Sequence, residues 1–463
     1  MNVINKAQTN TATKNPCKLC SPFGASLVFK GIRGTIPILH GSQGCSTYIR
    51  RYFISHFREP VDIASSNFVE ETSIFGGEKN LCEALENVNK QYNPEVIGVA
   101  TTCLSETIGD DVPLFLNDFL KKKGAEPFPD IIFVSTPSYS GTHMDGFHAA
   151  VRSIVEYYSR SRQTESSASL ISQAGKSVAV FPNFVSPEDI RHLKQIILDF
   201  GMKFVFVPDY SDTLDGATWD KYKKIPEGGT PKDDLLVLQK ISSVIEFGDS
   251  LDGKDSAGKF LGSEFGSKRY GLGLPVGIDL TDNFLNSLEI ISGRKTPDKY
   301  IAQRGRLVDA YCDAHKYLFG KKAVVFGEED MVMSIARFLC EIGMIPVLCA
   351  SGAKGDKMRE ISQQLFLEYK NEIIVRTKAD FVDIEEESEV LNPDLLIGNS
   401  KGYSLSRKLG IPLVRVGFPI HDRFGASRIS HLCYKGTQEL FDRIVNAVIA
   451  KKQSESVAGY TYM

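Results

Sequence analysis

The stretch Val96-Ile-Gly-Val-Ala-Thr-Thr-Cys-Leu-Ser-Glu-Thr-Ile-Gly-Asp-Asp111 decides how this chain folds, because it leads from a strand through a turn toward a helix. Its opening residues are mostly apolar and predict a buried strand. Asp110 and Asp111 precede an apolar helical pattern at 112–121, and carboxylates in that place cap the free N–H groups at the start of a helix. Strand, turn and helix together predict one unit of an α/β fold, with Cys103 in the turn.

The same alternation of short apolar runs and helical patterns continues along almost the whole chain, which predicts parallel sheets joined by crossover helices. Further strands are expected within 131–135, 177–181, 203–207, 322–327, 345–349, 395–402 and 411–419, and helices at 187–200, 297–319 and 331–342. The Gly- and Asp-rich stretch 248–273 is expected to be a loop, and the polar stretch 159–176 a linker. We therefore expect three Rossmann-like α/β domains in series, at 1–175, 176–320 and 321–463, with the chemistry in the first.

The composition is that of an ordinary globular protein. Of 463 residues, 42% are hydrophobic and 24% are charged, and roughly 100–200 residues per domain allow two to four domains. A formal net charge of −3 without a basic run argues against a nucleic-acid partner. No run approaches the ~20 apolar residues of a membrane span, and the polar N-terminus does not resemble a signal peptide. We expect a cytoplasmic protein whose nine cysteines are thiols or metal ligands.

Three cysteines lie in short motifs that can bend the backbone around a thiolate. They are Cys20 in Cys-Lys-Leu-Cys-Ser-Pro-Phe-Gly-Ala, Cys45 in His-Gly-Ser-Gln-Gly-Cys, and Cys103. Glycine or proline near each one lets the chain present N–H groups to a bound anion. Soft thiolates surrounded by amide donors are what an iron–sulfur cluster requires. Three ligands are one short of the usual four, which suggests that the cluster is shared with another subunit.

The remaining cysteines are expected to have other roles. Cys17 and Cys20 have C-x-x-C spacing, but no second pair follows at zinc-ribbon spacing, so a zinc site is not favoured. Five others lie in helical or strand patterns and are expected to be small buried hydrophobes. These are Cys82, Cys312, Cys340, Cys349 and Cys433.

Eight short motifs, taken in order, resemble the β-type subunits of nitrogenase component 1 and of its paralogue, the E/N scaffold for assembly of the iron–molybdenum cofactor. They are Pro-Phe-Gly-Ala at 22–25, His-Gly-Ser-Gln-Gly-Cys at 40–45, His-Phe-Arg-Glu-Pro at 56–60, Ile-Phe-Gly-Gly at 74–77, Thr-Thr-Cys-Leu-Ser-Glu-Thr-Ile-Gly-Asp-Asp at 101–111, Thr-Pro-Ser at 136–138, Ile-Gly-Asn-Ser at 397–400 and Gly-Phe-Pro-Ile-His-Asp-Arg at 417–423. The resemblance covers nearly the whole chain and implies the three-domain α/β fold of that family.

The resemblance also implies functional residues and partners. Cys20, Cys45 and Cys103 would hold half of an iron–sulfur cluster, either [4Fe-4S] or an eight-iron [8Fe-7S] P-cluster, shared with an α-type partner in a heterotetramer. Ser138 matches a serine near that cluster; it either ligates iron or only forms the turn after proline. Phe75 matches the position where the β-type subunit meets the electron-donating iron protein.

Two features near Cys45 remain open from the sequence alone. His40 either orients the cluster loop by hydrogen bonding or is a satisfied core histidine. Arg50, Arg51 and Arg58 form a basic cluster with His56 that could offset cluster charge, contact a partner, or be a solvated helix face.

Two members of the family compete for the function. The chain lacks the long insertions usual in catalytic β subunits, and the motifs at 141–148 and 407–413 look more like the N subunit of the scaffold. That subunit would receive electrons from the iron protein and pass them to a precursor, delivered by a donor protein and maturing on the α-type E partner. The alternative is the catalytic β subunit of nitrogenase or of a nitrogenase-like reductase, which the presence of all three cysteines and Ser138 favours. The sequence as a whole favours the N subunit.

Overall fold

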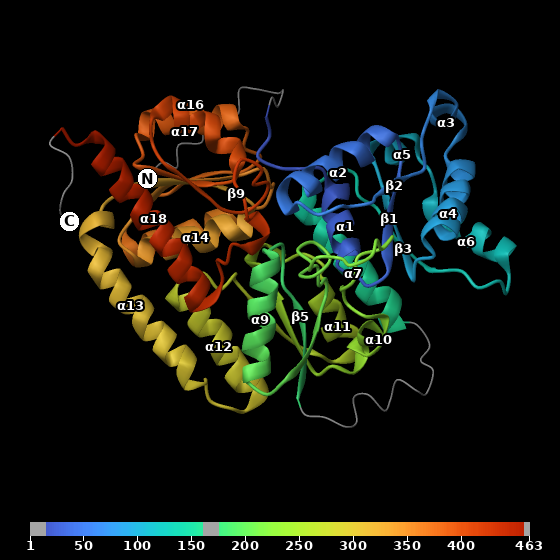
Figure 1. Ribbon diagram of the computed structural model, residues 1–463, viewed down its shortest axis with the longest axis horizontal. Helices are drawn as coiled ribbons and strands as arrows, with labels where there is room; N and C mark the ends of the chain where they lie inside the picture. Colours follow the sequence, from blue (N-terminus) through green and yellow to red (C-terminus); the bar gives the residue numbers. More distant parts are fainter. Residues whose placement is uncertain (1–14, 161–175, 458–463) are drawn as a thin grey trace.

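Three separate parallel sheets form the framework of the molecule (Figure 1). The computed structural model describes residues 15–160 and 176–457. The first sheet has the order β2 (Ala64–Ser65), β1 (Thr35–His40), β3 (Val96–Thr101), β4 (Asp130–Val134). The second has the order β6 (Lys203–Phe206), β5 (Ser177–Phe181), β7 (Ser243–Phe247), β8 (Lys268–Leu272). The third has the order β11 (Ile374–Arg376), β10 (Ile345–Ser351), β9 (Lys322–Gly327), β12 (Leu395–Gly398), β13 (Leu413–Arg415). The predicted α/β fold with three parallel sheets is confirmed.

Helices cover both faces of these sheets, as crossover connections between parallel strands require. Around the first sheet they are α1 (Ser21–Lys30), α2 (Gln43–Phe57), α3 (Glu70–Phe75), α4 (Glu78–Tyr92), α5 (Cys103–Ile108), α6 (Val112–Lys123) and α7 (His143–Arg160). Around the second they are α9 (Pro187–Asp199), α10 (Lys232–Leu236), α11 (Ala257–Phe265) and α12 (Ile278–Ser292). Around the third they are α13 (Asp298–Leu318), α14 (Glu329–Glu341), α15 (Lys357–Tyr369), α16 (Phe381–Leu391), α17 (Tyr403–Leu409) and α18 (Cys433–Glu455).

The two central strands of the first sheet are buried along their whole length and pair in parallel without a shift. Thr35 lies beside Val96 at one end, and His40 lies beside Thr101 at the other. The turns that leave β1 and β3 therefore begin side by side at the carboxyl edge of the sheet. In open α/β sheets this edge is where ligands bind.

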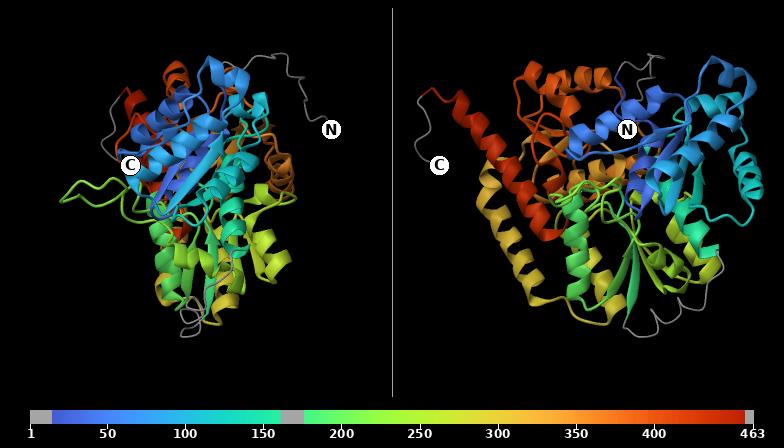
Figure 2. Two further views of the ribbon diagram at one scale, coloured as in Figure 1. Left: turned by 90° about the vertical axis from the view of Figure 1, so that its right-hand side faces the viewer. Right: turned by 45° about the vertical axis from the view of Figure 1, so that its right-hand side comes forward.

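The second sheet lies below the other two in both Figure 1 and Figure 2, and the first and third sheets sit next to each other. The described N-terminal segment joins these two neighbours. Pro16 forms a bridge with Asp380, Cys17 N–H donates to Ala379 O at 2.9 Å, and Gly352 N–H donates to Cys17 O at 3.0 Å. The chain then leaves the third sheet and enters α1, so Cys20 lies at the junction of the two units.

Parts of the sequence prediction need correction. The stretch 248–273, expected to be a loop, contains α11 and the strand β8. Ser256 caps α11 by accepting the N–H of Lys259, and β8 is an edge strand without a fully buried residue, so it lacks the apolar run that marks a buried strand. The expected linker 159–176 lies almost entirely outside the described residues. The domain limits at 175 and 320 remain predictions. Among the described residues, no helix is long and apolar enough to cross a lipid bilayer.

Candidate metal centre at the carboxyl edge of the first sheet

The three predicted cysteines all lie where a helix begins. Cys20 is the residue before α1, Cys45 lies in the first turn of α2, and Cys103 is the first residue of α5. Because α2 follows β1 and α5 follows β3, Cys45 and Cys103 start from neighbouring strand ends. Cys20 and Cys103 are exposed and Cys45 is half-buried. Unpaired N–H groups and the positive end of the helix dipole favour a negative charge at such places, so these positions suit thiolates.

The three thiols act on one another electrostatically. Burial raises the pKa of Cys45, and negative charge on Cys20 or Cys103 raises it further, whereas the Ser42 hydroxyl, 3.9 Å from the Cys45 Sγ, lowers it. Thiolates crowded at one place repel, and binding to a positively charged metal removes that cost. The described residues contain no group of three or more His, Cys, Asp or Glu side chains that could hold a single metal ion.

Ser138, in the loop after β4, lies between Cys20 and Cys103. Its N–H donates to the Sγ of Cys103 at 3.4 Å, and its Oγ accepts the N–H of Ser21 at 3.0 Å. The loop is fixed to the end of β3, because Thr136 donates two hydrogen bonds to Thr101: its N–H to the Oγ1 at 2.7 Å and its hydroxyl to the carbonyl oxygen at 2.6 Å. An N–H group aimed at a thiolate sulfur is the kind of donor found around iron–sulfur clusters.

Lys18 brings a positive charge to the same corner. Its ammonium donates to the carbonyl oxygens of Ser138 at 3.4 Å and Gly141 at 3.0 Å. Burial lowers the pKa of Lys18, and the charge of Lys354 lowers it further, while negative charge on Cys20 and Cys103 raises it. The ammonium therefore interacts favourably with the thiolates.

His40 does not face the thiols. Its ring is fully buried, with Nε2 at 3.0 Å from Asp110 Oδ2 and Nδ1 at 3.1 Å from Ser66 Oγ. Burial lowers its pKa and the Asp110 carboxylate partly restores it. Its carbonyl oxygen accepts both the N–H and the hydroxyl of Thr102, which fixes the turn before Cys103 to the end of β1. Thus the backbone and ring of His40 support the loops, and a direct role toward a cofactor remains a prediction.

Phe75 projects from the last position of α3 and is 86% exposed, beside Ile74, which is 76% exposed. Gly76 follows with a positive φ of 86°, and the N–H of Gly77 donates to the Asp110 carboxylate. The helix α3 packs against α5, which begins with Cys103. Phe75 therefore has the exposure that a docking anchor needs, and it belongs to the same domain as the thiols.

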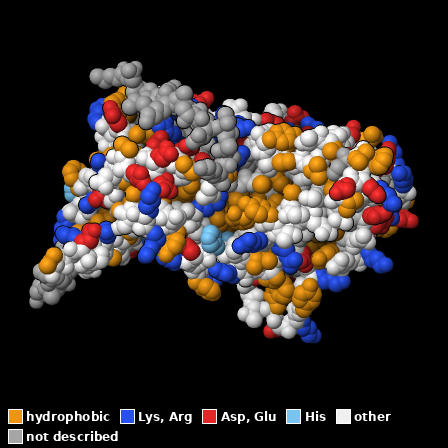
Figure 3. All heavy atoms as spheres, turned by 90° about the horizontal axis from the view of Figure 1, so that it is seen from above, with side chains coloured by type: hydrophobic (Ala, Val, Ile, Leu, Met, Phe, Trp, Pro, Cys, Tyr) orange, Lys and Arg blue, Asp and Glu red, His pale blue; other side chains and the backbone are white. Residues whose placement is uncertain are grey.

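Sequence reasoning missed three exposed apolar side chains close to the predicted ligands. Tyr48 follows Cys45 by three positions, Leu104 follows Cys103 directly, and Tyr139 follows Ser138 directly; Tyr139 is 61% exposed. Figure 3, which looks onto the side that carries α2 and α5, shows hydrophobic side chains gathered near the middle of this face. Exposed apolar surface beside polar chemistry marks a site of protein contact. The available signal was the position of these apolar side chains within three residues of a predicted ligand.

Other predicted side chains lie elsewhere. Cys17 is buried in the core of the third sheet, and burial raises its pKa to about 12. The basic cluster near Cys45 is not continuous, because His56 is buried and accepts the N–H of Ile420, while Arg50 donates to Val61 O and lies 3.5 Å from Asp62. The prediction of a buried thiol is wrong for Cys312, which is exposed on α13. It holds for Cys340, Cys349 and Cys433, while Cys82 is half-buried.

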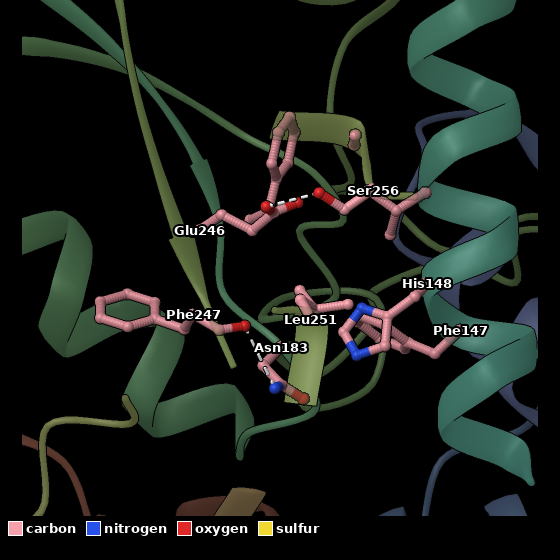
Figure 4. Close-up of a pocket in the computed structure, with 10 residues that line it drawn as sticks. Phe147, His148, Asn183, Glu246, Phe247, Leu251 and Ser256 are labelled. Carbon is pink, nitrogen blue, oxygen red and sulfur yellow. Dashed lines mark hydrogen bonds between the residues drawn. The ribbon is translucent and has the colours of Figure 1, made fainter. Parts of the chain in front are cut away.

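Two hollows away from the thiols offer no competing centre. A cavity of about 10 Å³ lies between α7 and the second sheet, lined by His148, Asn183 and Glu246 among others (Figure 4). It has room for about one water molecule. A more open cleft of about 390 Å³ lies beside β8 and α12, with Arg337 and Asp249 in its wall. Neither is lined by a cysteine.

Comparison with known proteins gives consistent matches over the whole chain. The sequence profile of the family described as "Nitrogenase component 1 type Oxidoreductase" matches residues 20–449. The nitrogenase molybdenum-iron protein beta chain of Clostridium pasteurianum is 35% identical, over 95% of this chain and 94% of the relative. The beta chain of Methanothermobacter thermautotrophicus is 34% identical over 97% and 96%, and that of Azotobacter vinelandii is 32% identical over 97% and 86%.

Solved structures agree with the sequence relatives. A chain from "Nitrogenase Cp1 at pH 6.5" superposes with a TM-score of 0.92 and 33% identity, covering 99% of this chain and 98% of that one. A chain from "Nitrogenase Cp1 at pH 5" has a TM-score of 0.72 and 15% identity, covering 98% and 92%, a likeness of fold alone.

Proposed function

The chain belongs to the nitrogenase component 1 family of oxidoreductases, and from that premise we propose that it is a β-type subunit holding half of an iron–sulfur cluster against an α-type partner. The observation that carries the proposal is the convergence of Cys20, Cys45, Cys103 and Ser138 at one exposed edge of the first sheet. Exposed thiols cannot enclose a cluster alone, and apolar side chains beside them offer a surface for the partner. The assembly would be a heterotetramer.

Each side chain has a defined task in this proposal. Cys20, Cys45 and Cys103 bind iron as thiolates at helix starts, where N–H groups stabilise their charge. The N–H of Ser138 donates to the Cys103 sulfur, and the Lys18 ammonium offsets negative charge. The partner surface, seated on the neighbouring apolar side chains, excludes water from the site. When bound, the cluster accepts and releases electrons.

We favour the catalytic β subunit, with an eight-iron cluster, over the scaffold N subunit that the sequence favoured. The short length no longer argues for the scaffold, because the clostridial catalytic chain aligns over 94% of its own length. The motif at 141–148 also has structural tasks unrelated to that choice, since Gly146 and His143 pack against the segment around Ser21. All three thiols and Ser138 stand together, as an eight-iron cluster would require.

The scaffold N subunit is the second candidate. The observation that favours it is the distinct environment of Cys45, which alone among the three thiols is half-buried and contacts a hydroxyl, as the surest ligand of a simpler [4Fe-4S] cluster would. In that case an E-type partner would hold a cofactor precursor from a donor protein. In both cases we propose that the iron protein docks on the surface around Phe75 and delivers electrons to the cluster.

Purification of the chain together with its partner, followed by iron counting and electron paramagnetic resonance, tests the proposal. We expect an eight-iron cluster at each interface and reduction of substrate when the iron protein is supplied. Four-iron clusters without turnover would support the scaffold instead, and an iron-free pair would contradict both.

The variant Cys103→Ala separates the two cluster types. It should abolish the eight-iron signal, while the matched control Cys312→Ala, which removes an exposed thiol on α13, should leave the signal unchanged. An intact eight-iron signal in Cys103→Ala would show that this thiol is not a required ligand.

A further inference from the structure

His143, the buried first residue of α7, makes two hydrogen bonds to the residue that precedes Cys20. The N–H of Leu19 lies 3.2 Å from His143 Nδ1, and the N–H of His143 donates to Leu19 O at 3.1 Å. A peptide N–H can only donate, so Nδ1 is the unprotonated nitrogen and Nε2 carries the hydrogen. The Nε2–H then donates to Glu328 Oε1 at 2.9 Å. One imidazole, in one tautomer, thus connects Leu19 with Glu328.

Glu328 belongs to the third sheet, where it follows β9 and precedes α14. Its side chain and that of His143 are both largely withdrawn from solvent. A hydrogen bond to a carboxylate in such surroundings is stronger and more directional than one at the surface. The ring of His143 is therefore held by the carboxyl end of a strand in another domain.

Cys20 is fixed on both sides by this corner of the molecule. Leu19 is held by His143, and Ser21 N–H is held by Ser138 Oγ. Helices α1 and α7 pack directly against each other here, because a Cβ added to Gly146 would lie only 2.0 Å from Ser21 O. With both adjoining peptides fixed, the position of the Cys20 backbone and the direction of its Cα–Cβ bond depend on the hydrogen bonds that His143 and Ser138 make.

We propose that His143, which is hydrogen-bonded to Glu328, is the positioning residue for Cys20. Through this hydrogen bond it couples the third domain to the edge of the first sheet where the thiols lie. The role in metal binding rests on the function proposed above. The role in holding the segment 19–21 does not depend on it, so the two can fail separately.

Two amide variants of His143 each keep one of the two hydrogen bonds that its ring makes. His143→Asn places an amide oxygen near Nδ1, where it still accepts the N–H of Leu19 but does not reach Glu328. His143→Gln places an amide N–H near Nε2, where it still donates to Glu328 but leaves the N–H of Leu19 without an acceptor. Hydrogen–deuterium exchange of the segment 19–21, measured on the full metal-free chain, should be at least about tenfold faster in the Gln variant. It should rise less in the Asn variant, which keeps the acceptor for Leu19 N–H and loses only the bond to Glu328.

Iron retention in the assembled pair gives a second readout. Iron affinity, measured by competition with a chelator, should fall about 10–100-fold for His143→Gln, the range in which affinity falls when residues that support a metal ligand are replaced. Glu328→Ala leaves His143 in place and is the alternative if the Gln variant fails to fold; it should also speed exchange at 19–21. The matched control is His148→Gln on the same helix, whose Nε2 lies in the small cavity of Figure 4 without a hydrogen-bond partner among the described residues.

The outcomes are distinct. Equal exchange at 19–21 in the Asn and Gln variants would overturn the proposal, because a ring that only fills space would not distinguish them. Faster exchange in the His148 control would overturn it too, since any change in α7 would then suffice. An iron-free wild-type pair would refute the proposed function, while the exchange data would still decide the role of His143.

Discussion

Two cysteines three positions apart show how surroundings decide the chemistry of a thiol. Cys17 is buried against the third sheet, its pKa is raised to about 12 by burial, and it stays a neutral core residue. Cys20 is exposed at the residue before α1, where its sulfur is accessible to a partner or a metal. The two cysteines of the C-x-x-C spacing thus lie in different surroundings, one in a core and one at the surface.

Replacement of Cys45 tests the most enclosed of the three ligands. Cys45→Ala should lower the iron affinity of the pair by more than the 10–100-fold seen when only supporting residues are lost, and should loosen the pair. Metal analysis and size-exclusion chromatography of the co-purified complex measure both effects. Iron content equal to that of wild type would exclude Cys45 as a ligand.

Replacement of Phe75 tests the docking surface. Because Phe75 is 86% exposed, Phe75→Ala should change the free energy of unfolding by no more than about 0.5 kcal/mol. If the ring is a docking anchor, the Kd for the iron protein should rise about 30-fold, which corresponds to about 2 kcal/mol. Phe319→Ala removes another exposed ring, at the end of α13, and should leave the Kd unchanged. An unaltered Kd in Phe75→Ala would refute its docking role.

At the scale of elements, the site depends on how closely α1 and α7 approach. Every residue of α1 is buried, because the helix lies between the first sheet and α7. Gly24 and Gly146 allow the contact: a Cβ on Gly24 would lie 1.7 Å from His143 O, and one on Gly146 would lie 2.0 Å from Ser21 O. Backbone, not flexible side chains, fills that space, so the helices cannot adjust locally. This packing brings the residues before α1 against those before α7.

A pair of identical substitutions tests this contact. Gly24→Ala should destabilise the chain by about 1–3 kcal/mol or more, the cost of overpacking a core. Gly305→Ala, in the exposed middle of α13 where an added Cβ meets nothing within 4 Å, should stabilise the chain by about 1 kcal/mol through helix propensity. Midpoints of urea unfolding for the two variants provide the measurement. A Gly24→Ala chain as stable as wild type would mean that α1 and α7 can separate freely.

At the scale of the whole molecule, the first and third domains are joined at several points around the site. The segment 15–17 bonds to residues 352 and 379–381 of the third unit, and His143 reaches Glu328. The N–H of Ile420 donates to His56 Nδ1 at 2.9 Å, and Arg58 donates to His421 O. The edge of the first sheet that carries the thiols therefore lies at the contact between the first and third domains. Its geometry depends on how these two domains pack against each other.

The buried His56 makes that junction sensitive to acid. Burial lowers its pKa to about 3, and the charges of His421 and Arg58 lower it further. Between pH 6.5 and about 3 the unfolded chain binds a proton that the folded chain does not, so stability is present above pH 6.5 and is lost as the pH falls toward 3. From pH 7 to pH 5 this group alone should lower the free energy of unfolding by about 2 kcal/mol.

Replacement of His56 by asparagine tests whether this side chain causes the loss of stability at low pH. His56→Asn keeps an acceptor for the N–H of Ile420 but cannot take up a proton, so its loss of stability between pH 7 and pH 5 should be about 2 kcal/mol smaller. The exposed His315→Asn is the matched control, and urea midpoints at the two pH values are the measurement. An unchanged difference in His56→Asn would show that another group causes the loss.

The sequence by itself determined the kind of fold, the family and the candidate ligands. Alternating apolar runs and capped helices are encoded within about 20 neighbouring residues, so β3, its turn and α6 could be predicted from local physics. The motifs around Cys20, Cys45 and Cys103 identified residues suited to metal. The edge strand β8 and the burial of His56 could not be predicted, because an exposed strand carries no apolar run and a histidine beside arginines looks solvated.

Only the tertiary structure decided which of these residues meet. Cys45 and Cys103 become neighbours because β1 and β3 pair in register, and Ser138 joins them because β4 lies next to β3. His143 and Glu328 are 185 positions apart. Strand order and register depend on contacts between distant segments, whose energies are shared over the whole core, so local patterns leave them undetermined. The ligands were readable in the chain; their common location was a property of the folded molecule.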